Sequence, residues 1–194
     1  MAGLGTLGIL LVIGVVCFGG LLVVVLGWGV ALYNGLISKR LLVDEAQSDI
    51  ETFLKKRYDM IPNLVEIVKG YAKHEKETLE NVVKFRNAAM NAGSFDEKMQ
   101  AEAQLTNTLK TLFAVAENYP DLKANTNFLD LQQKLADLEE NIQKSRRFYN
   151  GAVKEFNVKI AQFPANLVAG ILGFKARTFF EASEEEKENV QIKF

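Results

Sequence analysis

The chain has 194 residues, which is enough for one domain of ordinary size together with a membrane anchor. Its 23 lysines and arginines balance 24 aspartates and glutamates, so no excess of positive charge favours nucleic-acid binding. The single cysteine excludes an internal disulfide framework and a cysteine-rich metal site.

The first part of the chain predicts a transmembrane helix. No charged side chain precedes Lys39, and residues 7–32 are almost entirely Leu, Val, Ile and Gly. About 20 apolar residues cross the hydrocarbon core of a bilayer, and a longer stretch can tilt. A cleaved signal peptide would begin with a basic region and have an apolar stretch of roughly 7–15 residues. We therefore expect an uncleaved tail and anchor over residues 1–32.

Basic residues lie on one side of this span only. Lys39 and Arg40 follow it directly, Lys55, Lys56 and Arg57 come next, and no basic residue precedes it. Positive charge near the end of a span favours the cytoplasmic side. The pattern predicts a single-pass protein of the cell (inner) membrane, with its N-terminus outside and the following domain in the cytoplasm.

Small residues recur at every fourth position near the end of the span, at Gly27, Ala31 and Gly35. Such a face lets membrane helices approach closely, so it predicts a transmembrane packing site. Glycine is also common in membrane helices without any packing role. Both interpretations stay open.

The rest of the chain predicts an all-α fold. Apolar residues repeat at three- and four-residue spacing, as in amphipathic helices, and no alternating strand pattern competes. We expect an antiparallel helical bundle over residues 33–163, with coiled-coil-like seams and helices over about 33–90, 95–118 and 128–163. Ser94 and Glu97 form a capping box that opens the second helix. The segments NAGS and YPDLKANTN are the expected turns.

The expected helices differ in length. The first is longer than the second, so part of its apolar stripe must be covered by the third helix, the C-terminal segment or neighbouring subunits. This difference favours a homo-oligomer, which could be large, without fixing its size.

Arg57 interrupts the first apolar stripe between Leu54 and Ile61. If its guanidinium is buried, we expect an acidic partner for it. If it lies at the edge of the stripe, the guanidinium is solvated instead.

Pro62 lies in the middle of the first helix. Proline removes one helical hydrogen bond and costs about 3 kcal/mol in a helix interior. The stripe keeps its register across Pro62, which favours a kinked but continuous helix, whereas Asp59 as an N-cap would make Pro62 part of a new helix. The bundle then has three long helices, or four if the first breaks here. Asn63 would contribute a contact only if its amide bonds a neighbouring helix near Asn150 or Asn157.

Residues 164–194 predict a separate C-terminal segment. The run FPANLVAGILGF at 163–174 is too short to span a bilayer. It either closes the open end of the bundle, which we favour, or lies at a membrane interface. The glutamates from Glu184 to Glu188 form an acidic tail for which we expect no specific role.

No arrangement of residues predicts catalysis. His74 is the only histidine, and it lacks the second histidine of a zinc-protease motif. Tyr71 stands where a di-iron bundle would need glutamate. We expect no enzyme activity, no cofactor and no metal.

Several segments together resemble the LemA family over essentially the full length. They are Tyr33-Asn34, RYDMIPNLV at 57–65, GYAKHE at 70–75, ENYPDLKAN at 117–125, RRFYN at 146–150 and FPANLVAGILGF at 163–174. The resemblance implies a bacterial, membrane-anchored helical bundle without catalytic activity, of a type linked to magnetosome membrane formation. The signature and structural residues that we expect are Tyr33, Asn34, Arg57, Tyr58, Pro62, Asn63, Tyr119, Pro120, Arg146, Tyr149, Asn150, Asn157, Phe163, Pro164 and Asn166.

Two functional hypotheses follow. The first is a scaffold that self-associates in the lipid bilayer and organises a membrane patch or membrane proteins. The second is an adaptor or regulator that presents its bundle to a partner. Because relatives are often encoded beside membrane proteases or TPM-domain proteins, the resemblance makes such proteins the expected partners.

Overall fold

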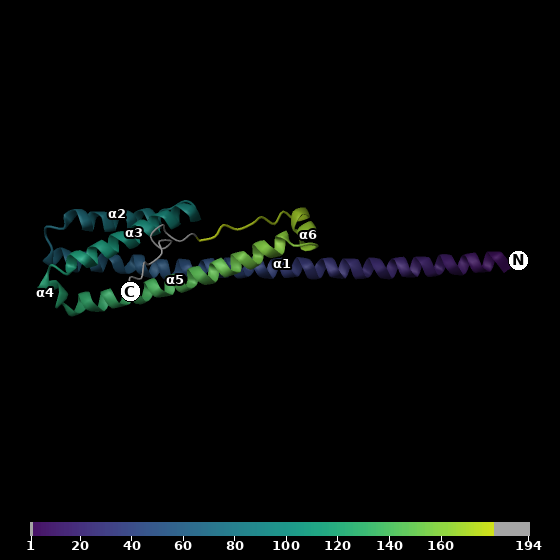
Figure 1. The fold of residues 1–194 in the computed structure, drawn as a ribbon, viewed down its shortest axis with the longest axis horizontal. Coiled ribbons are helices and arrows are strands. Elements are labelled where there is room, and N and C mark those ends of the chain that lie inside the picture. The colour runs from purple at the N-terminus through teal and green to yellow at the C-terminus, as the bar shows by residue number, and fades with distance from the viewer. Residues whose placement is uncertain (1, 181–194) are drawn as a thin grey trace, which may run out of the picture. The chain divides into compact units, whose positions relative to one another are not determined.

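The computed structural model describes residues 2–180 (Figure 1), and within them the chain is helical and contains no strand. The helices are α1 (Ala2–Tyr71), α2 (Lys76–Met90), α3 (Phe95–Ala116), α4 (Pro120–Lys123), α5 (Thr126–Ala161) and α6 (Ala165–Ile171). The predicted all-α fold is confirmed, whereas the antiparallel bundle with coiled-coil-like seams stays a prediction. The acidic tail at 184–188 lies outside the described residues.

The chain divides into two compact units. Among the described residues, the anchor unit comprises 2–44 and 151–178, and the helical unit comprises 45–150 and 179–180. Helices α1 and α5 each contribute residues to both units.

Helix α1 is continuous through Pro62, as the unbroken apolar stripe indicated. The predicted extension of this helix to residue 90 is wrong, because α1 ends at Tyr71 and α2 begins at Lys76. The six residues after Ala72 carry no large apolar side chain that could continue the buried stripe. The chain turns there, and the backbone N–H of Glu75 bonds the carbonyl of Ala72 at 3.2 Å.

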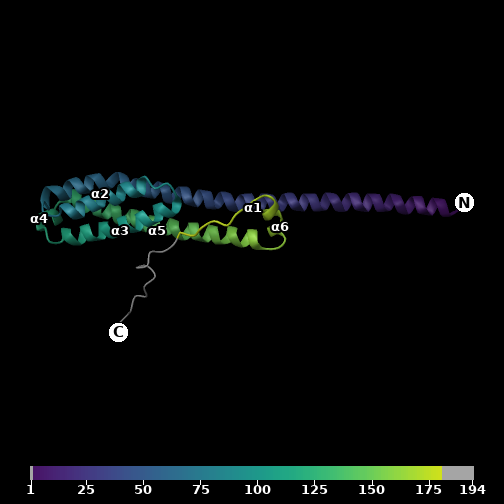
Figure 2. The ribbon, with the colours of Figure 1, turned by 90° about the horizontal axis from the view of Figure 1, so that it is seen from above.

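Helices α2 and α3 pack side by side in the helical unit (Figures 1 and 2). The NAGS turn between them and the capping box are both confirmed. The Ser94 hydroxyl accepts the N–H of Glu97 at 3.2 Å, and the Glu97 carboxylate accepts the N–H of Gly93 at 2.9 Å. In the usual capping box the Glu97 carboxylate would accept the N–H of the N-cap residue, Ser94, whereas here it accepts the N–H of the residue before it.

The second predicted turn contains the short helix α4. Pro120 is its first residue, a position where the missing N–H costs nothing. Asn125 then caps α5, because its side-chain oxygen accepts the N–H of Phe128 at 3.0 Å.

The predicted apolar stripes form the cores of the two units. In the helical unit the buried residues include Ile50, Leu54, Ile61, Leu64, Val68, Val82, Leu105, Leu112, Leu135, Ile142 and Tyr149. In the anchor unit they include Leu36, Val43, Val153, Phe156, Ala165 and Ala169.

Gly173 ends α6 in the anchor unit. Its φ of 72° is in the left-handed region that glycine adopts without strain. The N–H of Phe174 bonds the carbonyl of Ala169 at 2.9 Å, and that of Gly173 bonds Gly170 at 3.4 Å, which is the Schellman pattern of helix ends. The turn places the ring of Phe174 against Tyr33 and Phe156, at centroid distances of 6.5 and 6.3 Å.

Candidate functional site

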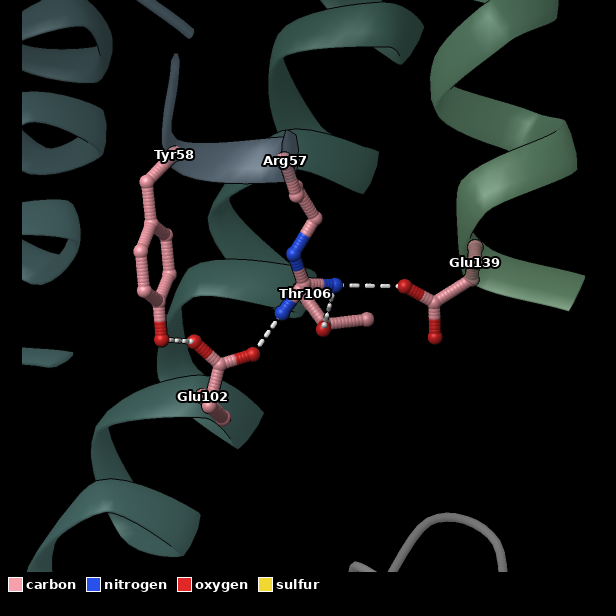
Figure 3. A network of polar contacts seen from close by, with 5 residues as sticks. All are labelled: Arg57, Tyr58, Glu102, Thr106 and Glu139. Carbon is pink, nitrogen blue, oxygen red and sulfur yellow. Dashed lines mark hydrogen bonds and ion pairs between the residues drawn. The ribbon is translucent and has the colours of Figure 1, made fainter. Parts of the chain in front are cut away.

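Arg57 occupies the centre of a buried polar network in the helical unit (Figure 3). Its Nη1 donates to the Glu139 carboxylate at 2.5 Å and to the Thr106 hydroxyl at 3.2 Å. Its Nη2 forms an ion pair with Glu102, whose other oxygen accepts the hydroxyl of Tyr58. One guanidinium therefore joins helices α1, α3 and α5.

Burial sets the electrostatics of this network. The side chains of Arg57 and Glu102 are 1% and 0% exposed, whereas Glu139 is 26% exposed. Loss of hydration lowers the pKa of Arg57, and the adjacent Glu139 opposes that shift. Burial also raises the pKa of Tyr58 to about 12, which keeps its phenol neutral and able to donate to Glu102.

The network is suited to holding helices together. Breaking a buried ion pair by removing one partner costs about 3–5 kcal/mol, because the other charge stays buried. A mainly apolar cavity of about 230 Å³ borders Arg57 and Glu139, and it is lined by Leu109, Phe113 and Leu135 among others. The acidic partner expected for a buried Arg57 is confirmed, and the solvated alternative is wrong.

Pro62 has a local consequence that sequence reasoning missed. A helical residue at position 62 would donate its N–H to the carbonyl of Tyr58, and proline has no such donor. The Nε of Arg86, on α2, donates to that carbonyl instead at 2.7 Å. Pro62 itself is exposed. Pro62 therefore leaves the carbonyl of Tyr58 available on α1, and Arg86 of α2 binds it.

Asn150 and Asn157 each bind the backbone of the segment that follows α6. In the helical unit, Asn150 accepts the N–H of Phe180 at 2.7 Å and donates to its carbonyl at 2.9 Å. In the anchor unit, Asn157 makes the same two bonds to Arg177, each at 2.9 Å. The two asparagines share one face of α5, because seven residues make nearly two turns. Asn63 is exposed and is not their partner.

Two other predicted residues support this segment within the helical unit. The guanidinium of Arg146 lies over the ring of Phe180, 4.3 Å from its centroid. Tyr149 is buried, and its ring contacts Phe95 at 5.5 Å between centroids. The ring of Phe95 in turn contacts that of Phe180 at 5.6 Å. The RRFYN signature thus serves to position the C-terminal segment.

The turn between α1 and α2 is tied to the start of α4. The hydroxyl of Tyr119 donates to Glu75 at 3.0 Å, a bond that raises the pKa of this phenol. The amide of Asn125 donates to the hydroxyl of Tyr71 at 2.9 Å. Both contacts join residues of the predicted signature across the end of the helical unit.

The predicted packing face of α1 is exposed in the single chain. Gly27 and Ala31 are exposed and Gly35 is partly so, and a Cβ at either glycine would have nothing within 4 Å. Within the described residues, no contact therefore requires glycine at these two positions. Whether they pack against a second copy stays a prediction.

The remaining predicted residues lie in the anchor unit. Tyr33 is 41% exposed and contacts Phe174, and the carbonyl of Asn34 accepts the hydroxyl of Ser38 at 2.9 Å. Phe163 precedes Pro164 through a cis peptide bond, and both Phe163 and Asn166 are exposed.

Sequence reasoning missed Glu102 and Glu139 as the partners of Arg57. Glu102 lies three residues before Leu105 and so extends the apolar stripe of α3. A carboxylate on a buried stripe was the available signal. Glu139 follows Leu138 at the edge of the apolar stripe of α5. From the sequence, a buried carboxylate at this position cannot be told from a solvated one.

Comparison with known proteins gives consistent matches. The LemA family model matches residues 46–194. The chain is 28% identical over 158 residues to a protein named LemA from Metamycoplasma hominis, covering 81% of this chain and 72% of that relative. It is 23% identical over 175 residues to magnetosome protein MamQ 2 of Paramagnetospirillum magneticum, covering 77% of this chain. It is 22% identical over 174 residues to magnetosome protein MamQ of Magnetospirillum gryphiswaldense, covering 76% of this chain. The chain spans 64% of the length of each magnetosome relative.

Proposed function

The chain belongs to the LemA family, and from that premise we propose that it is a membrane-anchored helical scaffold that self-associates and organises a patch of membrane. The proposal includes an antiparallel bundle in the helical unit, a single-pass α1 in the bacterial inner membrane, and a cytoplasmic helical unit. It assigns no catalysis, because Arg57 and Glu102 are sealed from solvent and hold helices.

The exposure of α1 is the observation that carries the proposal. Part of α1 is long and apolar enough to cross a membrane. Its large apolar side chains from Ile13 to Val30 are 46–71% exposed. Such a continuous apolar surface is unfavourable in water and favourable in a lipid core. Two relatives of the chain are named magnetosome proteins, which agrees with the magnetosome membrane formation that the family resemblance implies.

Self-association is tested by adding bulk to the small-residue face. Native mass spectrometry of the full chain in mild detergent should give a discrete oligomer. Gly27→Leu with Gly35→Leu should reduce its order. Gly29→Leu is the matched control, because it lies on the opposite side of α1 and also has open space around its Cβ. A wild-type monomer at working concentration would remove the scaffold.

Orientation is tested by labelling in intact cells. A cysteine at Asn91, in the exposed turn after α2, should resist a membrane-impermeant reagent when Cys17 is replaced by alanine. Labelling without cell lysis would reverse the proposed orientation.

A groove in the helical unit favours the adaptor as the second candidate. It has a volume of about 690 Å³, and Val65, Ala72, Leu79 and Val83 provide its apolar lining. Lys69, Lys73, Lys76 and Lys84 surround that lining, with Glu80 as the single acidic residue. This charge pattern complements an acidic amphipathic segment of a membrane protease or TPM-domain protein. Lys73→Glu with Lys84→Glu should abolish capture of such a partner and leave oligomer mass unchanged.

A further inference from the structure

Helix α6 buries two alanines and exposes two of its large apolar residues. Ala165 and Ala169 are 2% and 3% exposed. Four large apolar residues in or directly beside the helix, which we call the α6 face, are 51–85% exposed: Phe163, Leu167, Ile171 and Leu172. Leu167 and Ile171 are four residues apart and lie on one side of the helix. A helix that faced water would have the opposite arrangement.

The stretch of sequence that contains the α6 face has no charged residue. No Asp, Glu, Lys or Arg occurs from Ile160 to Phe174, and Lys159 and Lys175 follow directly on each side. An uncharged apolar segment between basic residues is typical of chain that lies in the interfacial region of a membrane.

Contacts within the anchor unit place α6 beside the end of the candidate span. The ring of Phe174, which directly follows α6, contacts the ring of Tyr33 at 6.5 Å. Tyr33 and the exposed Trp28 are the residue types enriched where a span leaves the lipid core. Twenty residues from Ile13 to Leu32 rise about 30 Å, the thickness of that core. Phe174 therefore holds the start of the following segment beside the end of this candidate span.

Basic side chains gather at the same level. A cavity of about 410 Å³ follows α6, and Arg40, Lys175 and Arg177 line it together with Phe156 and Phe174. Asp44 lies 2.6 Å from Arg177 and 3.8 Å from Arg40, so one carboxylate serves two guanidinium groups. Within residues 2–180 no ion pair involves Lys175, which is exposed. The cavity thus has a positive balance suited to lipid phosphate.

We propose that α6 is a second membrane contact, in which the α6 face lies in the headgroup–acyl boundary of the leaflet that α1 leaves, with Arg40 and Lys175 against anionic lipid phosphates. The inference rests on the membrane anchoring by α1 in the proposed function. It does not require self-association.

The test uses the full chain with Cys17→Ala, reconstituted in vesicles of phosphatidylcholine and phosphatidylglycerol. A fluorescent probe is attached to a single cysteine at Leu167, and quenching by brominated acyl chains is measured. Lys154→Cys is the matched control, because it is exposed on α5 in the same unit, before the uncharged segment. We expect quenching at 167 to be at least about threefold stronger than at 154.

A third probe, at Val24 within the candidate span, separates the two proposals. Quenching at 24 and 167 supports the second contact. Quenching at 24 without quenching at 167 overturns it and leaves α1 anchored. If neither position is quenched, the membrane anchoring itself fails. If the probe at 167 resists both brominated lipid and aqueous iodide, protein covers the α6 face and the inference is wrong.

A substitution confirms the cause of any quenching. Ile171→Gln should reduce quenching at 167 at least about twofold. Its side chain is 85% exposed, so the helix content of the chain in detergent should not change. In Ile171→Leu, the probe at 167 should be quenched as strongly as in the parent chain. Equal quenching in the Gln and Leu variants would contradict a lipid contact through this face.

Discussion

Arg86 donates a hydrogen bond from its Nε to the backbone carbonyl of Tyr58 at 2.7 Å. That carbonyl lies four residues before Pro62, so a regular helix would have used it internally. An unsatisfied carbonyl within a packed unit costs about 1–3 kcal/mol. We therefore expect the cost of the proline and the contribution of Arg86 to be linked, because a neighbouring helix supplies the donor that position 62 lacks.

A double-mutant cycle tests this link. Arg86→Met should destabilise the wild-type chain by about 1–3 kcal/mol, because it leaves the Tyr58 carbonyl without a donor. In the Pro62→Ala background the same substitution should cost clearly less, because residue 62 then provides a helical N–H. Urea unfolding of the four variants gives the coupling energy, which we expect to be about 1–2 kcal/mol.

Asn63→Ala is the control for position 62. It is exposed on the same helix, so it should change stability by no more than about 0.5 kcal/mol in either background. Additive effects of Pro62→Ala and Arg86→Met would mean that water already satisfies the carbonyl. Oligomer mass of the Pro62→Ala variant tests separately whether the proline also directs assembly.

The Arg57 network makes a second prediction. Glu102→Ala should cost about 3–5 kcal/mol, because it leaves a buried guanidinium with Glu139 and Thr106 alone. The apolar triple variant Arg57→Met, Tyr58→Phe and Glu102→Leu removes every buried member together and should be within about 1 kcal/mol of wild type. Thermal unfolding measures both. A triple variant as unstable as Glu102→Ala would show that the network contributes net stability.

Stability should also fall at high pH because of Tyr58. Burial raises its pKa to about 12, against about 10 in an unfolded chain. The neutral phenol is favoured in the folded state, so its contribution is complete below about pH 10 and is lost between pH 10 and 12. The free energy of unfolding should fall less steeply over this range in Tyr58→Phe than in wild type.

Tyr119→Phe is the comparison for that titration. The bond to Glu75 raises the pKa of Tyr119 as well, but its phenol is only partly buried. Removing the Tyr119 hydroxyl should reduce the pH dependence of the free energy of unfolding much less than removing that of Tyr58. Identical profiles for the two variants would contradict a special role for the buried phenol.

Periodicity predicted the helical fold because it reports which face of each segment is buried. Leu54, Ile61 and Leu64 lie in the core for the reason their spacing indicated. The position of Arg57 on that stripe left two possibilities open, a buried cation with an acidic partner and a solvated guanidinium, and its burial beside Glu102 decides for the first. Ser94 was sufficient to predict the start of α3, since a capping box is local chemistry.

Contacts between distant segments could not be predicted in the same way. Glu102 stands out as a carboxylate on the apolar stripe of α3, but nothing in the sequence pairs it with Arg57. Glu139 and Arg86 look like solvated charges on their helices. The end of α1 at Tyr71 was missed because the expected helix was continued through the six residues after Ala72, although none of them has a large apolar side chain. The bond from Arg86 to the carbonyl of Tyr58, 28 positions away, is a tertiary contact that no local pattern indicates.

The last prediction concerns Asn157 and Arg177. Two hydrogen bonds of 2.9 Å hold the backbone of residue 177 against α5, while its side chain binds Asp44 at 2.6 Å. Each backbone bond contributes about 1 kcal/mol. Asn157→Ala should therefore raise local opening, and amide hydrogen exchange at residue 177 should become about 5–30 times faster. Asn166→Ala, an exposed asparagine of α6 in the same unit, should leave that amide unchanged. Unchanged exchange in Asn157→Ala would mean that the ion pair with Asp44 is sufficient to hold the segment in place.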